Sequence, residues 1–261
     1  MDDYKAVDID TLILPSEIIK WIGSAAVYES SGHSSAKTLY IDHDDGAYLK
    51  IADHGFLHRA YVMQGFFHQH HLSSPVLDYI SSDRDYLLIA SVKGEDGTSK
   101  KHISNPKKLS DIFARSLRFL HDTDISNCPI EDKIGELIKL SETASFSKRH
   151  LDGISEYIGM VDSEKAANEI AQKSKLLKCD VLIHGDYCLP NVLYNDWNLE
   201  GFIDLADSGA GDRHYDLAMG LWTLYRNFKT YEYGWRFLDT YGWGNIDEER
   251  LRVCGLLVAI E

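Results

Sequence analysis

The strongest constraint on this chain is a short run of polar residues that follows an apolar segment in its C-terminal half. The residues Val181–Ile183 predict a strand, which continues directly into the sequence H-G-D, ending at Asp186. Gly185 permits a tight turn, so we expect Asp186 on a loop at the end of the strand. Asn191 follows five residues later, after Pro190, which stiffens the loop. The pattern therefore predicts a loop that carries a carboxylate and a carboxamide.

A predicted hairpin then leads to a second carboxylate. Two apolar runs, Val192–Tyr194 and Leu199–Ile203, are joined by a polar turn, so we expect the hairpin to bring Asp204 close to Asn191. Asparagine and aspartate oxygens are hard ligands, suited to Mg²⁺ that also holds phosphate oxygens. A further carboxylate, Asp186, held outside the metal shell, can accept or orient the proton of an attacking hydroxyl. This division of roles is typical of protein-kinase-type phosphoryl transfer. The plainer alternative is that these residues only form turns.

The rest of the chain predicts an α+β fold with two lobes. The first third is rich in short β-type runs, whereas apolar residues recur at helical spacing from Lys107 onward. We expect a small antiparallel β-rich N-lobe at residues 1–92, a hinge at 93–97, and a larger helical C-lobe at 98–261. The hinge is placed on a polar stretch with two glycines. The expected elements of the N-lobe are strands at 27–30, 38–41, 47–51 and 86–92, and a helix at 57–72.

Net charge limits the possible partners. The chain has 27 Lys and Arg against 41 Asp and Glu, which gives a formal net charge of −14. A field of this sign repels nucleic-acid phosphates and anionic lipids and attracts a polycationic small molecule. No apolar run approaches the roughly 20 residues of a membrane span, and the acidic N-terminus does not resemble a secretion signal. We therefore expect a cytoplasmic protein that binds neither nucleic acid nor membranes.

Two residue types do not point to a metal site or to disulfides. The four cysteines, Cys128, Cys179, Cys188 and Cys254, form no C-x-x-C pair, so free thiols are expected. The histidines at 68, 70 and 71 lie in a predicted helix that would direct them to different faces. The sequence G-x-x-x-x-G-K-[ST] is absent, which excludes a P-loop enzyme.

Three motifs carry a resemblance to a known family. The segments H-G-D-Y-C-L-P-N (184–191), G-F-I-D-L-A-D-S-G (201–209) and D-R-H-Y-D-L-A (212–218) resemble the aminoglycoside phosphotransferases. They are most similar to the 3′-phosphotransferase (kanamycin kinase) group, which has a protein-kinase-like fold. The resemblance extends over most of the chain and is most specific between residues 181 and 218.

The resemblance implies roles for individual residues of the C-lobe. Asp186 is implied as the catalytic base, and Asn191 and Asp204 as the magnesium ligands. His184 and Asp216 are implied as structural supports of the loop. We expect Asp212 to be structural as well.

In the N-lobe, the resemblance implies a site for ATP or GTP. Lys50 stands where a strand lysine neutralises the nucleotide phosphates, and Tyr48 shares its face of the strand, where an aromatic ring stacks on the adenine. The segment 31–35, with Ser31 and Ser34, resembles a nucleotide-positioning loop whose backbone amides approach phosphate. The implied hinge strand begins at Ala90 and ends at Val92, and its backbone pairs with the purine edge.

Two departures from the family pattern stand out. Kinase-like folds pair the strand lysine with a glutamate on the next helix, but Ala60 occupies the place where we expect that glutamate. The family's acidic C-terminal stretch is reduced here to Glu261 and the terminal carboxylate. Carboxylates that bind the acceptor's ammonium groups are therefore expected before the catalytic loop, with Asp152, Glu156 and Asp162 as candidates.

Three functional hypotheses remain open. The favoured one is transfer of the γ-phosphate of ATP or GTP, with Mg²⁺, to a hydroxyl of an aminoglycoside, the 3′-OH, which confers antibiotic resistance. The second keeps the fold and reaction but changes the acceptor to choline, homoserine, a macrolide or a ketosamine. The third is a nucleotide-binding pseudokinase, suggested by the missing glutamate, although a binding-only protein has no need of Asp186. We expect a monomer or a weak homodimer.

Overall fold

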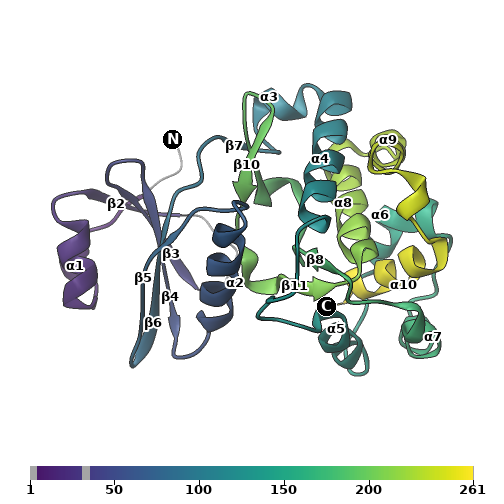
Figure 1. Cartoon of the computed structure of the whole chain (residues 1–261), viewed down its shortest axis with the longest axis horizontal. Coiled ribbons are helices and arrows are strands. Elements are labelled where there is room, and N and C mark those ends of the chain that lie inside the picture. Colours follow the sequence, from purple (N-terminus) through teal and green to yellow (C-terminus); the bar gives the residue numbers. More distant parts are fainter. Residues whose placement is uncertain (1–4, 31–35, 261) are drawn as a thin grey trace. The chain divides into compact units, whose positions relative to one another are not determined.

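A computed structural model describes residues 5–30 and 36–260 of the chain (Figure 1). These residues divide into two compact units, the first ending at Val92 and the second beginning at Lys93. Three candidate site residues, Ser31, Ser34 and Glu261, lie outside the described residues. In the described part, no helix has both the length and the apolar character needed to cross a bilayer.

The N-terminal unit is built on a six-stranded antiparallel sheet with the strand order β1-β2-β3-β4-β6-β5. The four predicted strands and the predicted helix are present within two to three residues of their expected bounds. The elements are β1 (Lys5–Ala6), a 3-10 turn (Ile9–Thr11), α1 (Ser16–Ile22), β2 (Ala26–Glu29), β3 (Lys37–Asp42), β4 (Ala47–Asp53), α2 (His58–Gln69), β5 (Val76–Ser81) and β6 (Arg84–Ala90).

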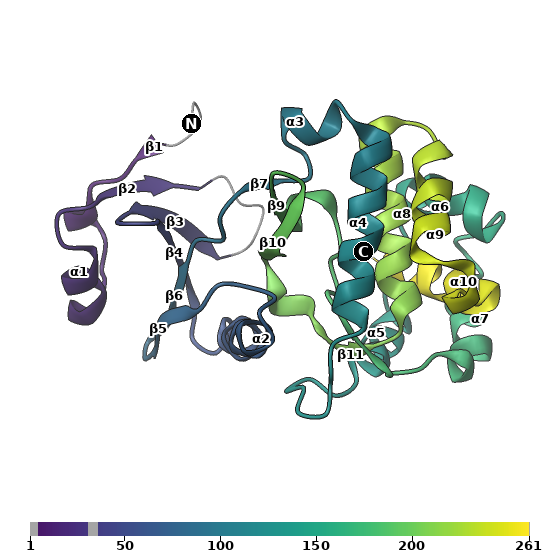
Figure 2. The same ribbon diagram turned by 45° about the horizontal axis from the view of Figure 1, so that its top comes forward.

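Helix α1 covers one face of this sheet. Ile18 and Ile22 of α1 are buried against apolar residues of the central strands, among them Leu49 and Ile51 of β4. Helix α2 lies on the opposite side of the sheet from α1 (Figure 2). Because side chains alternate along a strand, the residues between the core positions of β4 face away from α1.

The C-terminal unit is mainly helical. Its helices are α3 (Lys100–Ile103), α4 (Pro106–His121), α5 (Lys133–Ser141), α6 (Lys148–Ile158), α7 (Ala166–Lys173), α8 (Arg213–Phe228), α9 (Glu232–Tyr241) and α10 (Glu248–Val258). Short strands β7 (Glu95–Asp96), β8 (Val181–Ile183), β9 (Val192–Asn195), β10 (Asn198–Phe202) and β11 (Gly209–Gly211) lie between them. The structure thus has the α+β class expected from the sequence.

Helix α4 forms part of the core on which the small strands rest. Its residues Leu109, Phe113, Leu117 and Leu120 recur at helical spacing and are all fully buried. Figure 1 shows α4 alongside α8, with α9 and α10 packed around them. Strands β8 and β11 form an antiparallel pair, and β9 and β10 form the predicted hairpin.

The segment predicted as a hinge is partly bound into the C-terminal unit. Strand β7 pairs with β9, and the N–H of Gly97 donates to the carbonyl oxygen of Leu189 at 2.9 Å. Residues 95–97 therefore belong structurally to the hairpin layer that carries the candidate site.

Candidate active site

Gly185 allows the chain to turn directly after β8. Its φ is +82°, in the left-handed region that favours glycine. A Cβ atom at this position would lie 2.0 Å from the backbone oxygen of Asp207. A larger residue is therefore excluded by both conformation and space, and the turn places Asp186 at the end of the strand.

The backbone of this loop is held by a buried carboxylate from α8. The Asp216 side chain is fully buried and accepts the N–H of His184 at 2.7 Å and the N–H of Gly185 at 3.0 Å. The imidazole Nε2 of His121, on α4, lies 3.4 Å from the same carboxylate, and its Nδ1 lies 2.8 Å from the hydroxyl of Tyr241, on α9. Three helices thus converge on the start of the loop.

His184 connects the two halves of the candidate site. Its Nε2 lies 3.0 Å from the carbonyl oxygen of Ile203, and its Nδ1 accepts the backbone N–H of Asp186 at 3.2 Å. Since a carbonyl oxygen only accepts, the proton of the neutral ring is on Nε2. The buried imidazole therefore ties the loop at Asp186 to the residue that precedes Asp204.

Asp186, Asn191 and Asp204 are brought together by hydrogen bonds within this segment. The Asn191 amide nitrogen donates to the Asp186 Oδ2 at 2.8 Å and to the Asp186 backbone oxygen at 2.9 Å. The N–H of Ile203 donates to the carbonyl oxygen of Asn191 at 3.0 Å, which places Asp204 one residue beyond this contact. Asp204 has a left-handed backbone, with φ of 61° and ψ of 60°, and its side chain is exposed.

The chemistry of these atoms fits a divalent cation shared with phosphate. Asn191 uses its amide nitrogen on Asp186, so its carboxamide oxygen is the atom suited to a cation, and Asp204 supplies a carboxylate. Within the described residues there is no group of three or more His, Cys, Asp or Glu side chains that could hold a metal alone. Sites of this kind are completed by the phosphates of a bound nucleotide.

The thiol of Cys188 lies among these acidic groups. Burial raises its pKa strongly, and the nearby carboxylates of Asp186 and Asp204 raise it further. A thiol in this environment stays protonated and is a poor nucleophile.

Several anchors of the loop were not predicted from sequence patterns. The Tyr187 hydroxyl donates to the backbone oxygen of Phe113 at 2.6 Å, and their rings stack with centroids 4.3 Å apart. The Lys133 residue is only 7% exposed, and its ammonium pairs with Asp207 at 2.9 Å. In both pairs the partners are 74 residues apart in the sequence. A local sequence pattern cannot predict a contact over that separation.

Asp212 is structural in the way the sequence suggested. Its buried carboxylate accepts from the His214 ring at 2.6 Å, from the Arg250 Nε at 2.9 Å and from the N–H of Lys178 at 2.9 Å. Burial opposes its charge, but these partners outweigh burial and hold its pKa below the usual range. Asp212 thus joins α8 to α10 rather than contacting a ligand.

The nucleotide-binding candidates in the N-terminal unit lie on β4 and at the end of β6. Tyr48 and Lys50 are half-buried on the face of β4 that points away from α1, opposite Ile89 and Leu87 of β6. The N–H of Ala90 already donates to the carbonyl oxygen of Pro75 at 3.1 Å, and its carbonyl oxygen accepts the Ser74 hydroxyl at 2.5 Å. Val92 follows the strand, which ends at Ala90 and not at residue 92 as predicted.

The acceptor-binding candidates lie on or near α6. Asp152 and Glu156 are exposed and four residues apart, so they are neighbours on the helix surface. In the described part of the chain, neither carboxylate lies within ion-pair distance of a cationic side chain. Asp162 is different, because the Lys165 ammonium lies 2.8 Å from its carboxylate and lowers its pKa. Of the three, Asp162 is the least suited to bind a ligand's ammonium group.

Similar proteins share both the sequence and the fold. A family model described as the phosphotransferase enzyme family matches residues 30–254. A "probable aminoglycoside 3′-phosphotransferase" of Lactococcus lactis is 38% identical over 257 residues, which cover 98% of each chain. An aminoglycoside 3′-phosphotransferase of Niallia circulans is 28% identical over 64% of each chain.

Solved structures extend this similarity to the fold. The crystal structure of an aminoglycoside 3′-phosphotransferase of type VIII covers 97% of this chain and 92% of its own, with a TM-score of 0.66 and 20% identity. A Streptomyces rimosus aminoglycoside phosphotransferase in complex with ADP and streptomycin covers 97% of this chain and 91% of its own, with a TM-score of 0.60 and 19% identity. From the match over residues 30–254 and the full-length similarity, the chain belongs to the phosphotransferase enzyme family.

Proposed function

We propose that this protein transfers the γ-phosphate of ATP or GTP to the 3′-hydroxyl of an aminoglycoside antibiotic and thereby confers resistance. The observation that carries the proposal is the hydrogen bond from the Asn191 amide to the Asp186 carboxylate, which links a candidate base to a candidate metal ligand. The 38% identity to a probable aminoglycoside 3′-phosphotransferase supports the choice of acceptor. The site of action is the cytoplasm, where nucleoside triphosphates are available.

Asp186 orients the acceptor hydroxyl. One oxygen of its carboxylate is fixed by Asn191, and its backbone N–H is fixed by His184, so the carboxylate is positioned before the acceptor arrives. A positioned base of this kind contributes about 10²–10⁴ to the rate. Asp186 takes the proton as the hydroxyl oxygen bonds to the γ-phosphorus and the nucleoside diphosphate leaves.

Asn191 and Asp204 would hold Mg²⁺ through the carboxamide oxygen and the carboxylate. When bound, the cation supplies positive charge that neutralises the nucleotide phosphates. Asn191 would then serve two purposes at once, because its amide nitrogen holds Asp186 and its oxygen would hold the cation. Loss of either atom disturbs both the base and the metal site.

The N-terminal unit supplies the remaining nucleotide contacts. Lys50 pairs with the α- and β-phosphates, and Tyr48, two residues before it on the same face of β4, stacks on the base. Ser31 and Ser34 position the phosphates through their backbone amides. Ala90 and Val92 lie beside the purine edge. The N–H of Ala90 is bonded to Pro75, and its carbonyl oxygen, which accepts the Ser74 hydroxyl, keeps a second lone pair for the purine.

Asp152, Glu156 and Glu261 bind the ammonium groups of the acceptor. Two unpaired carboxylates at positions i and i+4 repel each other, and a bound ammonium group relieves that repulsion. Helix α6 is fixed on α8 through Gly153, since a Cβ there would lie 3.1 Å from the Trp222 ring and 3.3 Å from the Tyr225 ring. Helix α8 in turn contacts the catalytic loop, because Thr223 accepts the N–H of Leu189 at 3.3 Å.

The test is a coupled assay of ADP and GDP release with kanamycin, neomycin, choline and homoserine as acceptors. We expect turnover with the aminoglycosides, a loss of about 10²-fold or more for Asp186→Ala with nucleotide binding kept, and a raised Mg²⁺ requirement for Asp204→Asn. Asp196→Ala, an exposed aspartate on the hairpin turn, is the matched control and should leave turnover unchanged. Turnover only with choline or homoserine would overturn the acceptor, and near-normal turnover of Asp186→Ala would overturn its role.

Acceptor recognition is tested separately by salt and by neutral variants. Exposed charge attraction is screened over about 8 Å at physiological ionic strength, so added salt should raise the KM for kanamycin. Glu156→Gln should raise the same KM with a smaller change in kcat, because binding contacts act on ground and transition states alike. Glu142→Gln, an exposed glutamate at the end of α5, is the control. If the KM for kanamycin responds neither to salt nor to Glu156→Gln, the proposed binding of the acceptor by these carboxylates is wrong. The proposed phosphotransferase activity would not be affected by that result.

A further inference from the structure

A pocket of about 430 Å³ lies between α4 and the β9–β10 hairpin, within the C-terminal unit. Its apolar wall is formed by Ile112 and Phe119 of α4 and by Trp197 and Leu199 of the hairpin. Phe119 is 55% exposed, an unusual degree of exposure for a phenylalanine on a helix that otherwise buries its apolar side chains. The volume lies in the range of sites that hold one small organic molecule.

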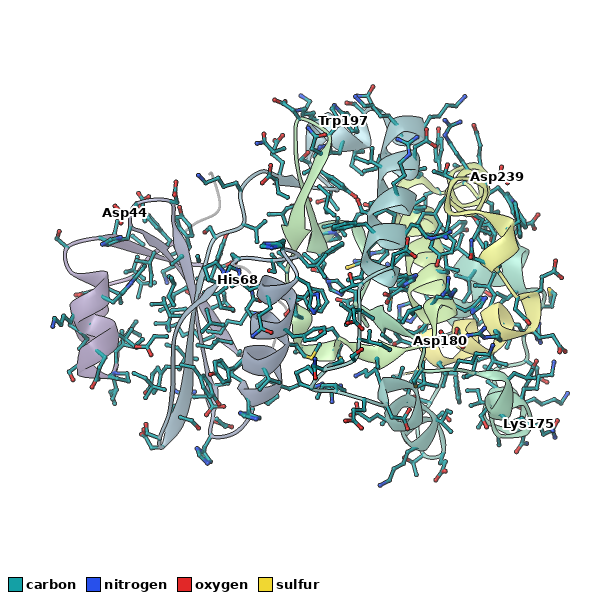
Figure 3. All side chains as sticks on the ribbon, viewed as in Figure 1. Asp44, His68, Lys175, Asp180, Trp197 and Asp239 are labelled. Carbon is teal, nitrogen blue, oxygen red and sulfur yellow. The ribbon has the colours of Figure 1, made fainter. Side chains whose placement is uncertain are left out.

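The hairpin side of the pocket is held in place by aromatic contacts. Trp197 lies in the turn of the hairpin with a left-handed backbone, φ of 71°, and Figure 3 labels it there. The His102 ring meets the Trp197 ring edge-on at 4.8 Å, and the Lys108 ammonium lies 4.3 Å from the indole centroid. The indole is therefore fixed before any ligand arrives, so little side-chain entropy is lost on binding.

The α3–α4 side of this pocket carries a charge opposite to that of the whole protein, whereas the hairpin side carries Asp196, which pairs with Lys101, and Glu200. The net charge of the chain is −14, yet residues 100–118 hold six of its 27 lysines and arginines and one acidic residue, Asp111. The carboxylate of Asp111 is already engaged by Arg236 at 2.6 Å and by Thr240 at 3.0 Å. A small anion is thus repelled by most of the surface and attracted to this part of α3 and α4.

Arg115 is the cation at the pocket itself. It lines the pocket together with Ser116. Its charge acts on Asp111, one turn earlier on α4, but the hydrogen bonds of that carboxylate go to Arg236 and Thr240. Other cations of the segment are engaged, such as Lys101, which pairs with Asp196 at 3.0 Å, and Lys107, which pairs with Glu232 at 3.7 Å. A guanidinium beside a wall of indole and phenyl rings is suited to a carboxylate or sulfonate attached to a flat apolar body.

A buried hydroxyl lies near Ser116, which is one of the residues that line the pocket. The Tyr194 hydroxyl belongs to a side chain only 1% exposed and has no hydrogen-bond partner within the described residues. Burial raises the pKa of this hydroxyl, and Ser116 lies close enough to oppose that shift. Ser116 lines the pocket, and its own hydroxyl donates to the carbonyl oxygen of Ile112 at 2.8 Å.

We propose that this pocket is a second small-molecule site, which binds an amphipathic organic anion: a flat apolar ring system bearing a carboxylate or sulfonate. The apolar part packs between Phe119 and Trp197, and the acid group pairs with Arg115. The proposal is independent of the acceptor chemistry proposed above, because it uses none of the same residues. The ligand also touches the hairpin that joins Asn191 to Asp204, through Leu199.

The test uses anilinonaphthalene sulfonate as the probe, titrated against the full chain by fluorescence. We expect one saturable site. Arg115→Gln should raise the dissociation constant about fivefold, which corresponds to about 1 kcal/mol for an ion pair at a partly open site. Phe119→Ser should also weaken binding, without loss of stability because Phe119 is exposed. Arg149→Gln, which removes the same charge from exposed α6, is the control and should bind as the unaltered chain does.

Two further measurements locate the probe. In a nitrogen-15 spectrum, the indole N–H signal of Trp197, assigned with Trp197→Phe, should shift on titration, whereas those of Trp21 and Trp222 should not. Excess ADP should not displace the probe, and anilinonaphthalene without its sulfonate should bind more weakly. Equal weakening by Arg115→Gln and Arg149→Gln, displacement by ADP, or a titration that leaves the Trp197 signal unmoved would each overturn the proposal.

Discussion

Replacing Asp216 with asparagine should strongly destabilise the C-terminal unit, although the two side chains have nearly the same shape. The carboxylate is fully buried and accepts two backbone N–H groups, those of His184 and Gly185, with one oxygen each. In Asp216→Asn one oxygen becomes an amide donor that faces a donor. A buried donor left without an acceptor costs about 1–3 kcal/mol, and the other hydrogen bond loses its charge assistance. The expected loss is therefore about 3 kcal/mol of unfolding free energy, out of about 5–15 for a typical domain.

The assay is urea unfolding at neutral pH, followed by circular dichroism, with Asp196→Asn as the matched substitution. Asp196 is 87% exposed and pairs with Lys101 at 3.0 Å, so the same chemical change should cost at most about 1 kcal/mol there. If the two variants unfold at the same urea concentration, the loop does not depend on Asp216 for its position. Nucleotide-dependent turnover should also fall in Asp216→Asn, because the loop that carries Asp186 loses a support.

Two further predictions concern the same loop. Gly185→Ala should cost more than about 2 kcal/mol, because its Cβ would lie 2.0 Å from the Asp207 oxygen, whereas Gly244→Ala, with nothing within 4 Å, should change stability by less than about 0.5 kcal/mol in the same unfolding assay. The pKa of His121 is lowered below 6.5 by burial, so the unfolded chain takes up its proton first as the pH falls. The stability that His121 contributes is complete above about pH 6.5 and is lost below it, and His121→Gln should flatten this fall, as measured by the urea midpoint between pH 7.5 and pH 5.5. If the urea midpoint of His121→Gln falls with pH as steeply as that of the unaltered chain, groups other than His121 cause the loss of stability in acid.

The local elements of the fold could be predicted because their signals are local. Apolar periodicity located α4, and alternation with turn residues located β3, β4 and the β9–β10 hairpin. Strand β1 has two residues and α1 has seven, so neither presents enough repeats to be recognised. Strand β11 reads Gly-Ala-Gly, a sequence that disfavours strands, and it forms because β8 pairs with it.

The polar residues of the candidate site could be predicted, and the family resemblance named His184 and Asp216 as supports of the loop, but the contacts that α4 and α9 make with Asp216 and His121 could not be predicted. Asp186, Asn191 and Asp204 lie within 19 consecutive residues, where spacing and turn chemistry are sufficient to bring them together. The contact between His121 and Asp216 spans 95 residues, and that between His121 and Tyr241 spans 120. Each depends on how α4, α8 and α9 pack, which sequence periodicity leaves undetermined. A prediction from local pattern therefore finds the residues that face a ligand more readily than the residues that position them.

Helix α2 lacks the glutamate expected at position 60, and it is anchored to the sheet in another way. Ala60 is 6% exposed, and α2 carries no acidic side chain, so this helix is not held by an ion pair of its own to the strand lysine. Its start is fixed instead by Asp85 of β6, whose buried carboxylate accepts the N–H of Leu57 at 2.8 Å and the hydroxyl of Ser81 at 2.7 Å. Burial opposes the charge of Asp85, but these hydrogen bonds outweigh burial and hold its pKa below the usual range. Because the sheet itself anchors α2, the absence of the glutamate leaves the helix positioned, and it is weak support for a pseudokinase.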